Sequence, residues 1–199
     1  MDVQEAISKR RSIRRFSQEP IEETVLYELI GSARLAPSAS NLQPLQYMPV
    51  WQPELLDPVF DCTKWAGYLP DYAPKAGNKP MAYIIILVNE EIRKQGADTD
   101  AGAAVQNILL SAVEKGLGTC WIGSVDRPRV TELLGIPENH HIHSLVALGY
   151  PAESPVWEDQ STDSIQYYLD ETGRIHVPKR NFDDIIILPK QGKEEENKA

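Results

Sequence analysis

Cysteine and long apolar runs are the two features that this sequence most clearly lacks. Cys62 and Cys120 are the only cysteines among 199 residues. They form no Cys-x-x-Cys pair, so neither a disulfide framework nor a cysteine-based zinc site is expected. Met1 leads directly into Asp-Val-Gln-Glu rather than into a signal peptide, and no apolar run approaches the length of a membrane span. We therefore expect a soluble, cytoplasmic protein with reduced thiols and no membrane partner.

Positive charge is also in deficit. The chain has 20 Lys and Arg against 29 Asp and Glu, which gives a net charge of -9 and an isoelectric point near 5.0. DNA, RNA and anionic lipid repel such a chain on average, so we expect no nucleic-acid partner. The length and the 42% hydrophobic content suit one core. We expect a single domain over residues 1–190 and a disordered, charged tail over residues 191–199.

Against this acidic background, four arginines stand within six positions. Residues 10–16, here called the arginine segment, read Arg-Arg-Ser-Ile-Arg-Arg-Phe. Arginine can grip phosphate bidentately, and the hydroxyl of Ser12 adds a neutral donor. In an extended backbone Arg10, Ser12 and Arg14 project to one side, and Ile13 faces the other way. The pattern favours a bound phosphate, and the alternative is a solvated face near a helix end.

Hydrophobic periodicity predicts alternating helices and strands. The run at residues 83–88 is β-branched and apolar on both faces, which is typical of a central strand covered by helices on both sides. A broad apolar stripe with many small residues predicts a helix over 99–115, with Asp98, Thr99 or Asp100 as its cap, that could serve both a core and a dimer interface. Further helices are expected near residues 2–9, 21–35, 54–61 and 126–134, strands at 45–51 and 142–150, and a hairpin at 167–169 and 174–177.

Two other segments suit ligand contacts. Residues 36–44, here called the proline-flanked loop, read Ala-Pro-Ser-Ala-Ser-Asn-Leu-Gln-Pro and can bring amides close to a flat polar ligand, or can be an ordinary connection. Residues 116–123 form a glycine-bounded turn and short strand, where a ligand can approach the backbone or where a strand simply ends. His140, His141 and His143 lack carboxylate or cysteine partners at ligand spacing, so we expect no metal site.

These segments together resemble the nitroreductase family of FMN-dependent oxidoreductases. The resemblance covers about residues 1–185 and includes Leu148-Gly149-Tyr150-Pro151 and the basic pair Lys179-Arg180 besides the segments above. It implies an α+β fold with a mostly antiparallel central sheet flanked by helices. It also implies an intertwined homodimer with two FMN sites at the subunit interface.

The resemblance implies a role for each segment. By position, the flavin phosphate and ribityl chain would be held by Arg10, Arg11, Ser12, Arg14, Lys179 and Arg180. The partner subunit would line the ribityl chain and the ring with Pro37, Ser38, Ser40, Asn41 and Gln43. The backbone beside the N5 edge of the ring would come from Cys120, Trp121, Ile122 and Gly123.

The implied activity is transfer of electrons from NADH or NADPH through FMN to a small acceptor such as a nitroaromatic or a quinone. The flavin carries this chemistry, so no catalytic side chain is expected. The alternatives are another FMN reaction, such as dehalogenation, flavin destruction or enone reduction, and a non-enzymatic flavin-binding or storage protein. Trp65, Tyr68 and Tyr72 are expected to border the substrate face, or otherwise to fill a satellite core.

Overall fold

The computed structural model describes residues 1–160 and 163–189. The chain divides into two compact units, the first over Met1–Pro155 and the second from Val156 onward, and each is described by itself. One FMN-binding domain over residues 1–190 stays a prediction. The tail predicted at residues 191–199 lies outside the described residues. No helix of the described residues has both the length and the apolar character needed to cross a bilayer.

An antiparallel sheet organises the first unit. Its order is β1 (Leu45–Val50), β2 (Ala82–Asn89), β4 (His140–Gly149) and β3 (Gly118–Ile122), and every neighbouring pair is antiparallel. All eight residues of β2 are buried, as the apolar run at 83–88 predicts for a central strand. The predicted α+β class with a mostly antiparallel sheet is confirmed.

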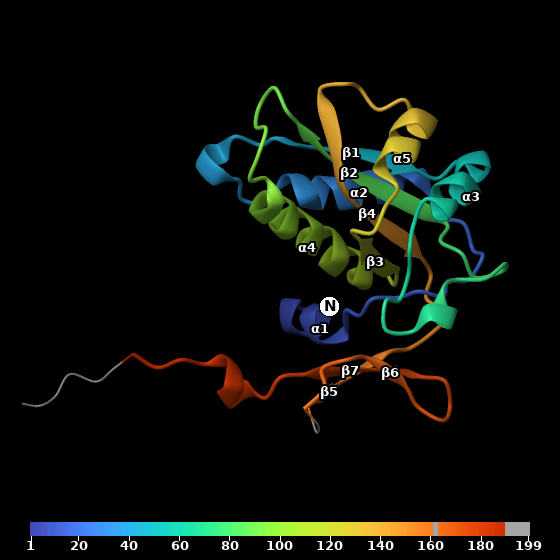
Figure 1. Ribbon diagram of the computed structural model, residues 1–199, viewed down its shortest axis with the longest axis vertical. Helices are drawn as coiled ribbons and strands as arrows, with labels where there is room; N and C mark the ends of the chain where they lie inside the picture. Colours follow the sequence, from blue (N-terminus) through green and yellow to red (C-terminus); the bar gives the residue numbers. More distant parts are fainter. Residues whose placement is uncertain (161–162, 190–199) are drawn as a thin grey trace, which may run out of the picture. The chain divides into compact units, whose positions relative to one another are not determined.

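Helices cover both faces of this sheet, and Figure 1 shows α4 and α5 on opposite sides of the strands. One face carries Ile84 and Ile86 and packs against α2 (Glu23–Arg34) and α4 (Asp98–Glu114). The other carries Tyr83 and Ile85 and packs against α3 (Pro53–Asp61) and α5 (Arg127–Leu134). Each fully buried isoleucine contributes about 1.5–3 kcal/mol relative to exposure, so the two-sided core fixes the position of β2.

Two helix ends have clear local signals, whereas the predicted cap of α4 is wrong. The helix α1 (Val3–Lys9) is capped by the carboxylate of Asp2, and α5 stops at Gly135, where φ is +61°. In α4 the N-cap position is Ala97, which provides no side-chain cap. Asp100, one of the predicted caps, instead lies buried inside the helix.

The second unit contains a small three-stranded sheet with the order β5-β7-β6. The strands β6 (Tyr168–Leu169) and β7 (Ile175–Lys179) form the predicted antiparallel hairpin. The strand β5 (Val156–Asp159) pairs parallel to β7 and was not predicted, because four residues of mixed polarity give no period to detect. A short 3₁₀ turn follows at Phe182–Ile185.

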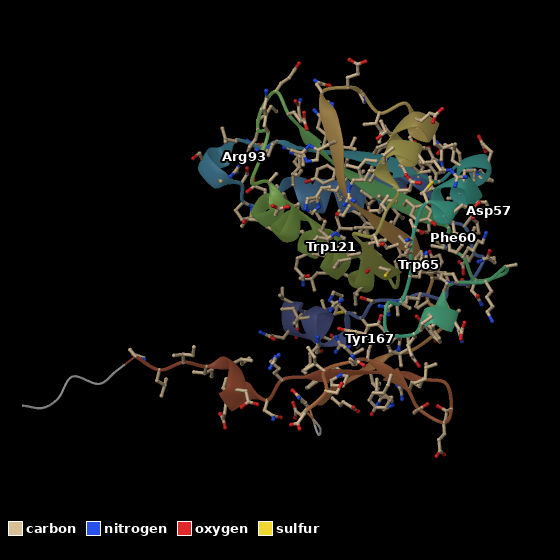
Figure 2. All side chains as sticks on the ribbon, in the orientation of Figure 1. Asp57, Phe60, Trp65, Arg93, Trp121 and Tyr167 are labelled. Carbon is tan, nitrogen blue, oxygen red and sulfur yellow. The ribbon has the colours of Figure 1, made fainter. Side chains whose placement is uncertain are left out.

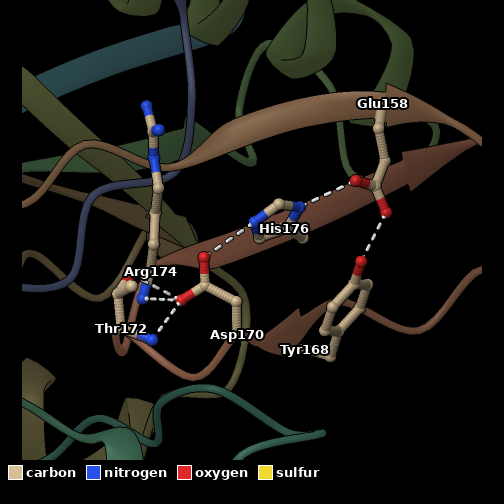
Figure 3. Close-up of polar contacts among 6 residues, drawn as sticks. All are labelled: Glu158, Tyr168, Asp170, Thr172, Arg174 and His176. Atoms are coloured by element: carbon tan, nitrogen blue, oxygen red, sulfur yellow. Dashed lines mark hydrogen bonds and ion pairs between the residues drawn. The ribbon is translucent and has the colours of Figure 1, made fainter.

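A histidine ties the three strands of this small sheet together (Figure 3). His176 on β7 has its Nδ1 2.7 Å from Glu158 Oε2 on β5 and its Nε2 3.2 Å from Asp170 Oδ2 after β6. The hydroxyl of Tyr168 donates to Glu158 at 2.8 Å, and its ring stacks on the imidazole. The Glu158 hydrogen bond raises the pKa of His176, and hydrogen bonds from Thr172 and Arg174 lower the pKa of Asp170 to about 2.

Candidate cofactor site

The arginine segment is fixed to the edge of the sheet by apolar packing on two glycines. The backbone N–H of Ile13 donates to the carbonyl of Thr119 on β3 at 2.8 Å. The Ile13 side chain lies so close to Gly118 that a Cβ added there would be 2.7 Å from Cγ1. Phe16 lies against Gly149 in the same way, with 2.7 Å between an added Cβ and Cδ1. Ile13 and Phe16 are both buried, so Ile13 faces inward as predicted.

A carboxylate provides a second attachment for this segment. Glu153 accepts hydrogen bonds from the backbone N–H groups of Arg14 and Arg15. Its other oxygen accepts the hydroxyl of Tyr72 at 2.7 Å, and the Arg15 guanidinium lies 4.1 Å from the centre of that ring. Burial, reinforced by Glu153, raises the pKa of Tyr72 to about 12. The backbone of the segment is thus held independently of its arginine side chains.

Arg10 and Arg11 differ in the contacts that their side chains make. Arg11 donates to the carbonyls of Arg10 and of Ser8 at the end of α1, so its donors satisfy the helix terminus. Arg10 and Ser12, by contrast, make no side-chain hydrogen bond or ion pair within residues 1–160 and 163–189. Burial lowers the pKa of both Arg10 and Arg11, and Arg10 further lowers that of Arg11 by repulsion. An anion at Arg10 and Ser12 would relieve this repulsion.

Asp100 holds the proline-flanked loop. Its carboxylate accepts the Ser38 hydroxyl at 2.7 Å and the Ala39 N–H at 3.2 Å, and it lies 3.6 Å from the guanidinium of Arg93. Asp100 is buried and Arg93 is partly buried. Arg93 is labelled in Figure 2. The Ser38 hydroxyl also accepts the Gln43 N–H at 3.0 Å, which closes the loop on itself.

The exposed tip of this loop is strained. Ser40, Asn41 and Gln43 have φ values of +53°, +55° and +52°, a region that side-chain-bearing residues rarely adopt. Pro37, Ser40, Asn41 and Gln43 are exposed, and a cavity of about 150 Å³ lies under the loop beside Asp100. Strain of this kind persists where the surroundings enforce it, and it is common at ligand-binding loops.

At the far end of β3 the side chains alternate between the core and the surface. Cys120 and Ile122 are buried in the core. Burial raises the pKa of Cys120 to about 11, so its thiol is protonated at neutral pH and is no nucleophile. Trp121 is exposed and lines a cavity of about 450 Å³ with Gly123. This part of the strand offers backbone and indole contacts rather than reactive sulfur.

The three rings of the predicted aromatic cover occupy different environments. Trp65 stacks on Phe60 at 5.9 Å and donates from its indole to Thr63 (Figure 2). Tyr72 is buried against Glu153, whereas Tyr68 is exposed. A role of these rings at the substrate face stays a prediction.

The structure brings some of the predicted site residues together and separates others. Thr119, beside the arginine segment, pairs with Leu148, which pairs with Ala82 on β2. Leu45, which follows the proline-flanked loop, pairs with Val88 six residues along β2. Standard strand spacings then separate the two segments by about 25 Å. The arginine segment therefore lies beside residues 118–123 of the same chain, and the loop does not. Lys179 and Arg180 belong to the second unit, and their role stays a prediction.

Sequence reasoning missed the residues that hold these segments. Asp100 was weighed only as a helix cap, and Glu153 carries no local signal because its partners lie 81 to 139 positions away in sequence. Gly118 and Gly149 stand inside the segments that carry the resemblance, but the close approach of Ile13 and Phe16 requires the tertiary structure. Each of the three histidines at 140–143 has a hydrogen-bond partner in the structure.

Comparisons with known proteins identify the family. A family model described as "Nitroreductase family" matches residues 7–150. The chain is 34% identical over 154 residues to a candidate NADH dehydrogenase/NAD(P)H nitroreductase of Archaeoglobus fulgidus, with 74% of this chain and 84% of the relative covered. A nitroreductase family protein of Clostridium novyi NT superposes with a TM-score of 0.66 at 28% identity, covering 77% of this chain and 87% of that one. An FMN-dependent nitroreductase of Clostridium difficile R20291 gives 0.63 at 26% identity, covering 76% and 88%. The chain belongs to the nitroreductase family.

Proposed function

We propose that this protein is an FMN-dependent oxidoreductase that passes electrons from NADH or NADPH to a small acceptor such as a nitroaromatic or a quinone. The observation that carries the proposal is the attachment of the arginine segment beside β3, which leaves Arg10 and Ser12 as donors without a protein acceptor among the described residues. Two similar proteins support the proposal by their names. The Clostridium difficile structure is called an FMN-dependent nitroreductase, and the name of the Archaeoglobus fulgidus relative includes NAD(P)H nitroreductase.

The donor set suits the phosphate of FMN. Arg10 supplies charge and a planar fork, and Ser12 supplies a neutral donor on the same extended segment. Lys179 and Arg180 would add charge to the same phosphate. From Thr119 the strand β3 leads to Trp121 and Gly123, so a ligand anchored at Arg10 would extend along it toward these residues. Bound FMN would supply the hydride-accepting N5 position and the redox chemistry.

The protein's own contribution is binding and orientation. Cys120 is protonated and buried, so residues 120–123 can contact a flavin ring through their backbone and through the exposed indole of Trp121. Backbone N–H groups directed at the ring would favour negative charge on its reduced form. Glu153, Ile13 and Phe16 hold the arginine segment without using the arginine side chains, which leaves Arg10 for the cofactor.

A homodimer is part of the proposal. The proline-flanked loop and the arginine segment of one chain lie about 25 Å apart, too far for both to line one ribityl chain. A second copy can supply the loop, whose strained, exposed tip is rich in amide and hydroxyl groups. Sedimentation at micromolar concentration tests this: we expect a dimer, and a monomer with flavin fully bound would contradict it.

The visible absorption spectrum of the purified protein is the first test. We expect a flavin spectrum that leaves with the protein on gel filtration, and oxidation of NADH or NADPH that depends on an added quinone. A colourless protein that does not bind added FMN would overturn the proposal. Flavin binding without turnover would instead favour the flavin-storage alternative, and turnover restricted to halogenated or enone substrates would favour another FMN reaction.

A further inference from the structure

His143 and Ser144 lie side by side at an irregularity of β4. Ser144 pairs with Ile86 and Ile142 pairs with Leu87, so His143 is an extra residue without a partner in the register. A regular strand sends neighbouring side chains to opposite faces, whereas a bulge re-aims one of them. Here the bulge brings an imidazole next to a hydroxyl.

These two residues belong to a continuous chain of hydrogen bonds. The indole N–H of Trp121 donates to Ser144 Oγ at 2.7 Å, and this oxygen lies 2.9 Å from His143 Nδ1. The other ring nitrogen of His143, Nε2, lies 3.2 Å from Asp98 Oδ1 at the start of α4. Ser144 is only 2% exposed, whereas the side chain of Asp98 is 87% exposed. The chain thus joins a buried hydroxyl to a carboxylate in solvent.

Trp121 sets the direction of every bond in this chain. An indole nitrogen only donates, so Ser144 Oγ must accept from it and keeps its own hydrogen for His143 Nδ1. Neutral His143 then carries its proton on Nε2 and donates it to Asp98. All four groups are satisfied in this single arrangement.

The remaining charged groups nearby make other contacts. Arg127 on α5 donates to the backbone carbonyls of His143 and Ile142 at 2.8 and 2.9 Å, and to that of Gly123. His141 on β4 pairs with Glu90 at 2.8 Å. Asp98 is therefore the charged group that meets the imidazole of His143, within the part of the chain that the structure describes.

We propose that Asp98, His143 and Ser144 are positioning residues that hold the indole of Trp121 in one orientation at the wall of its cavity, and that protonation of His143 loosens this hold. The cavity has a volume of about 450 Å³, and Trp121 is 42% exposed. A volume of this size suits a small planar ligand, which would meet the indole as a preformed wall. That the ligand is an electron acceptor rests on the proposed function, whereas the positioning of Trp121 does not.

The effect of a proton follows from donor counting. When His143 is protonated, both ring nitrogens are donors, so Nδ1 turns from accepting to donating toward Ser144. The Ser144 oxygen then accepts from two sides, and its own hydrogen loses its acceptor in a buried site. A buried donor without an acceptor is costly, so the chain rearranges and the Trp121 bond weakens.

Indole N–H resonances of the ¹⁵N-labelled full chain test the proposal. The protein has four tryptophans, so Trp51, Trp65 and Trp157 serve as internal controls. We expect Ser144→Ala to accelerate hydrogen exchange of the Trp121 indole about tenfold and to leave the other three unchanged. Exchange at the wild-type rate in Ser144→Ala would overturn the proposal.

The pH dependence gives a second measurement that does not require the Ser144 variant to fold. We expect the Trp121 resonance of the wild type to move when acid protonates His143 and that of His143→Asn to stay constant, because asparagine has no proton to gain there. His141→Asn is the matched control, since His141 lines the same cavity outside the hydrogen-bond chain, and it should keep the wild-type profile. A pH-independent Trp121 resonance in the wild type, or a profile abolished by His141→Asn, would refute the proposal.

Turnover separates this inference from the proposed function. If the protein reduces quinones, His143→Asn should raise the KM for the quinone by a larger factor than it lowers kcat, because it disturbs the cavity wall rather than the reacting atoms. An unchanged KM would count against the cavity as an acceptor site. If the purified protein carries no flavin, the proposed function fails, while the resonance experiment still decides whether the three residues position Trp121.

Discussion

The arginine segment and the proline-flanked loop are both candidate cofactor contacts, yet the fold holds them by opposite means. Two buried apolar side chains, a backbone hydrogen bond to β3 and Glu153 fix the arginine segment. The loop is held by polar contacts: Asp100 accepts two hydrogen bonds from it and faces Arg93, and the carbonyl of Pro44 accepts the N–H of Asn89. The first anchorage is mainly apolar and the second is mainly polar.

This difference has a functional meaning. A segment that must present a fixed charge to a phosphate gains from rigid apolar packing, because packing does not compete with the anion for donors. In the proposed dimer, a polar anchor would hold the base of the loop while its exposed tip meets the second subunit. The following predictions test this contrast.

The largest effect on stability is expected where Phe16 of the arginine segment packs on Gly149. Gly149→Ala places a Cβ 2.7–2.8 Å from Phe16, in the core of the first unit, so either the side chain or the strand must shift. We expect a loss of about 3 kcal/mol in the free energy of unfolding, measured by urea denaturation. The control is Gly31→Ala in α2, where an added Cβ meets nothing within 4 Å and a helix-favouring residue should stabilise by about 0.5–1 kcal/mol. Equal stability of the two variants would contradict the proposed close packing.

A somewhat smaller loss of stability is expected when Asp100, which holds the proline-flanked loop, is changed. Asp100→Asn puts an amide NH₂ opposite either the Ser38 hydroxyl or the Ala39 N–H, and it removes the charge that faces Arg93. We expect a loss of about 2 kcal/mol, together with faster hydrogen exchange confined to residues 36–44. Glu91→Gln, a change at an exposed site elsewhere in the first unit, should stay within about 0.5 kcal/mol of the wild type. Exchange that rises equally over the whole first unit would mean that Asp100 does not act on the loop alone.

Removal of one candidate phosphate ligand should weaken cofactor binding without loosening the segment. Arg10→Ala and Arg180→Ala should each lower the affinity for FMN roughly tenfold to a hundredfold, measured by fluorescence titration. Stability should change little for Arg10→Ala, because the backbone of the segment is held by Ile13, Phe16 and Glu153. Riboflavin lacks the phosphate and should respond weakly to either change. If riboflavin loses as much affinity as FMN, neither arginine binds the phosphate.

The smallest effect on stability is expected in the second unit, where the contact between His176 on β7 and Glu158 on β5 depends on pH. The pKa of His176 is raised, so its stabilising contribution is complete below the ordinary histidine value of about 6.5 and is lost as pH rises through the folded value. The pKa values of Glu158 and Asp170 are lowered, so their contributions are complete above about 4.5 and are lost in acid. The small sheet should therefore be most stable between about pH 4.5 and 6.5. Hydrogen exchange of the β7 amides should show the strongest protection in this pH range. In His176→Gln the loss of protection at higher pH should disappear, because glutamine does not titrate.

Sequence patterns predicted the elements of the first unit because each pattern is local. The apolar run at 83–88 identified the central strand, and the apolar stripe over 99–115 identified α4. The cap of α4 was predicted wrongly, since Asp100 is an acceptable cap residue by type and only the fold places Ser38 and Ala39 within reach of its carboxylate. The strand β5 escaped prediction because its pairing with β7 is long-range and its own sequence is short and mixed.

By itself the sequence determined the family resemblance, the α+β class and the position of the arginine segment, because arginine clustering, glycine spacing and apolar periodicity are properties of neighbouring residues. Only the tertiary structure decided which arginine donors remain open, since Arg11 turns to the end of α1 whereas Arg10 does not. Only it placed Asp98, His143 and Ser144 in one chain of hydrogen bonds with Trp121. Such contacts join residues up to 45 positions apart, and their geometry depends on a bulge and on helix packing that no local pattern encodes.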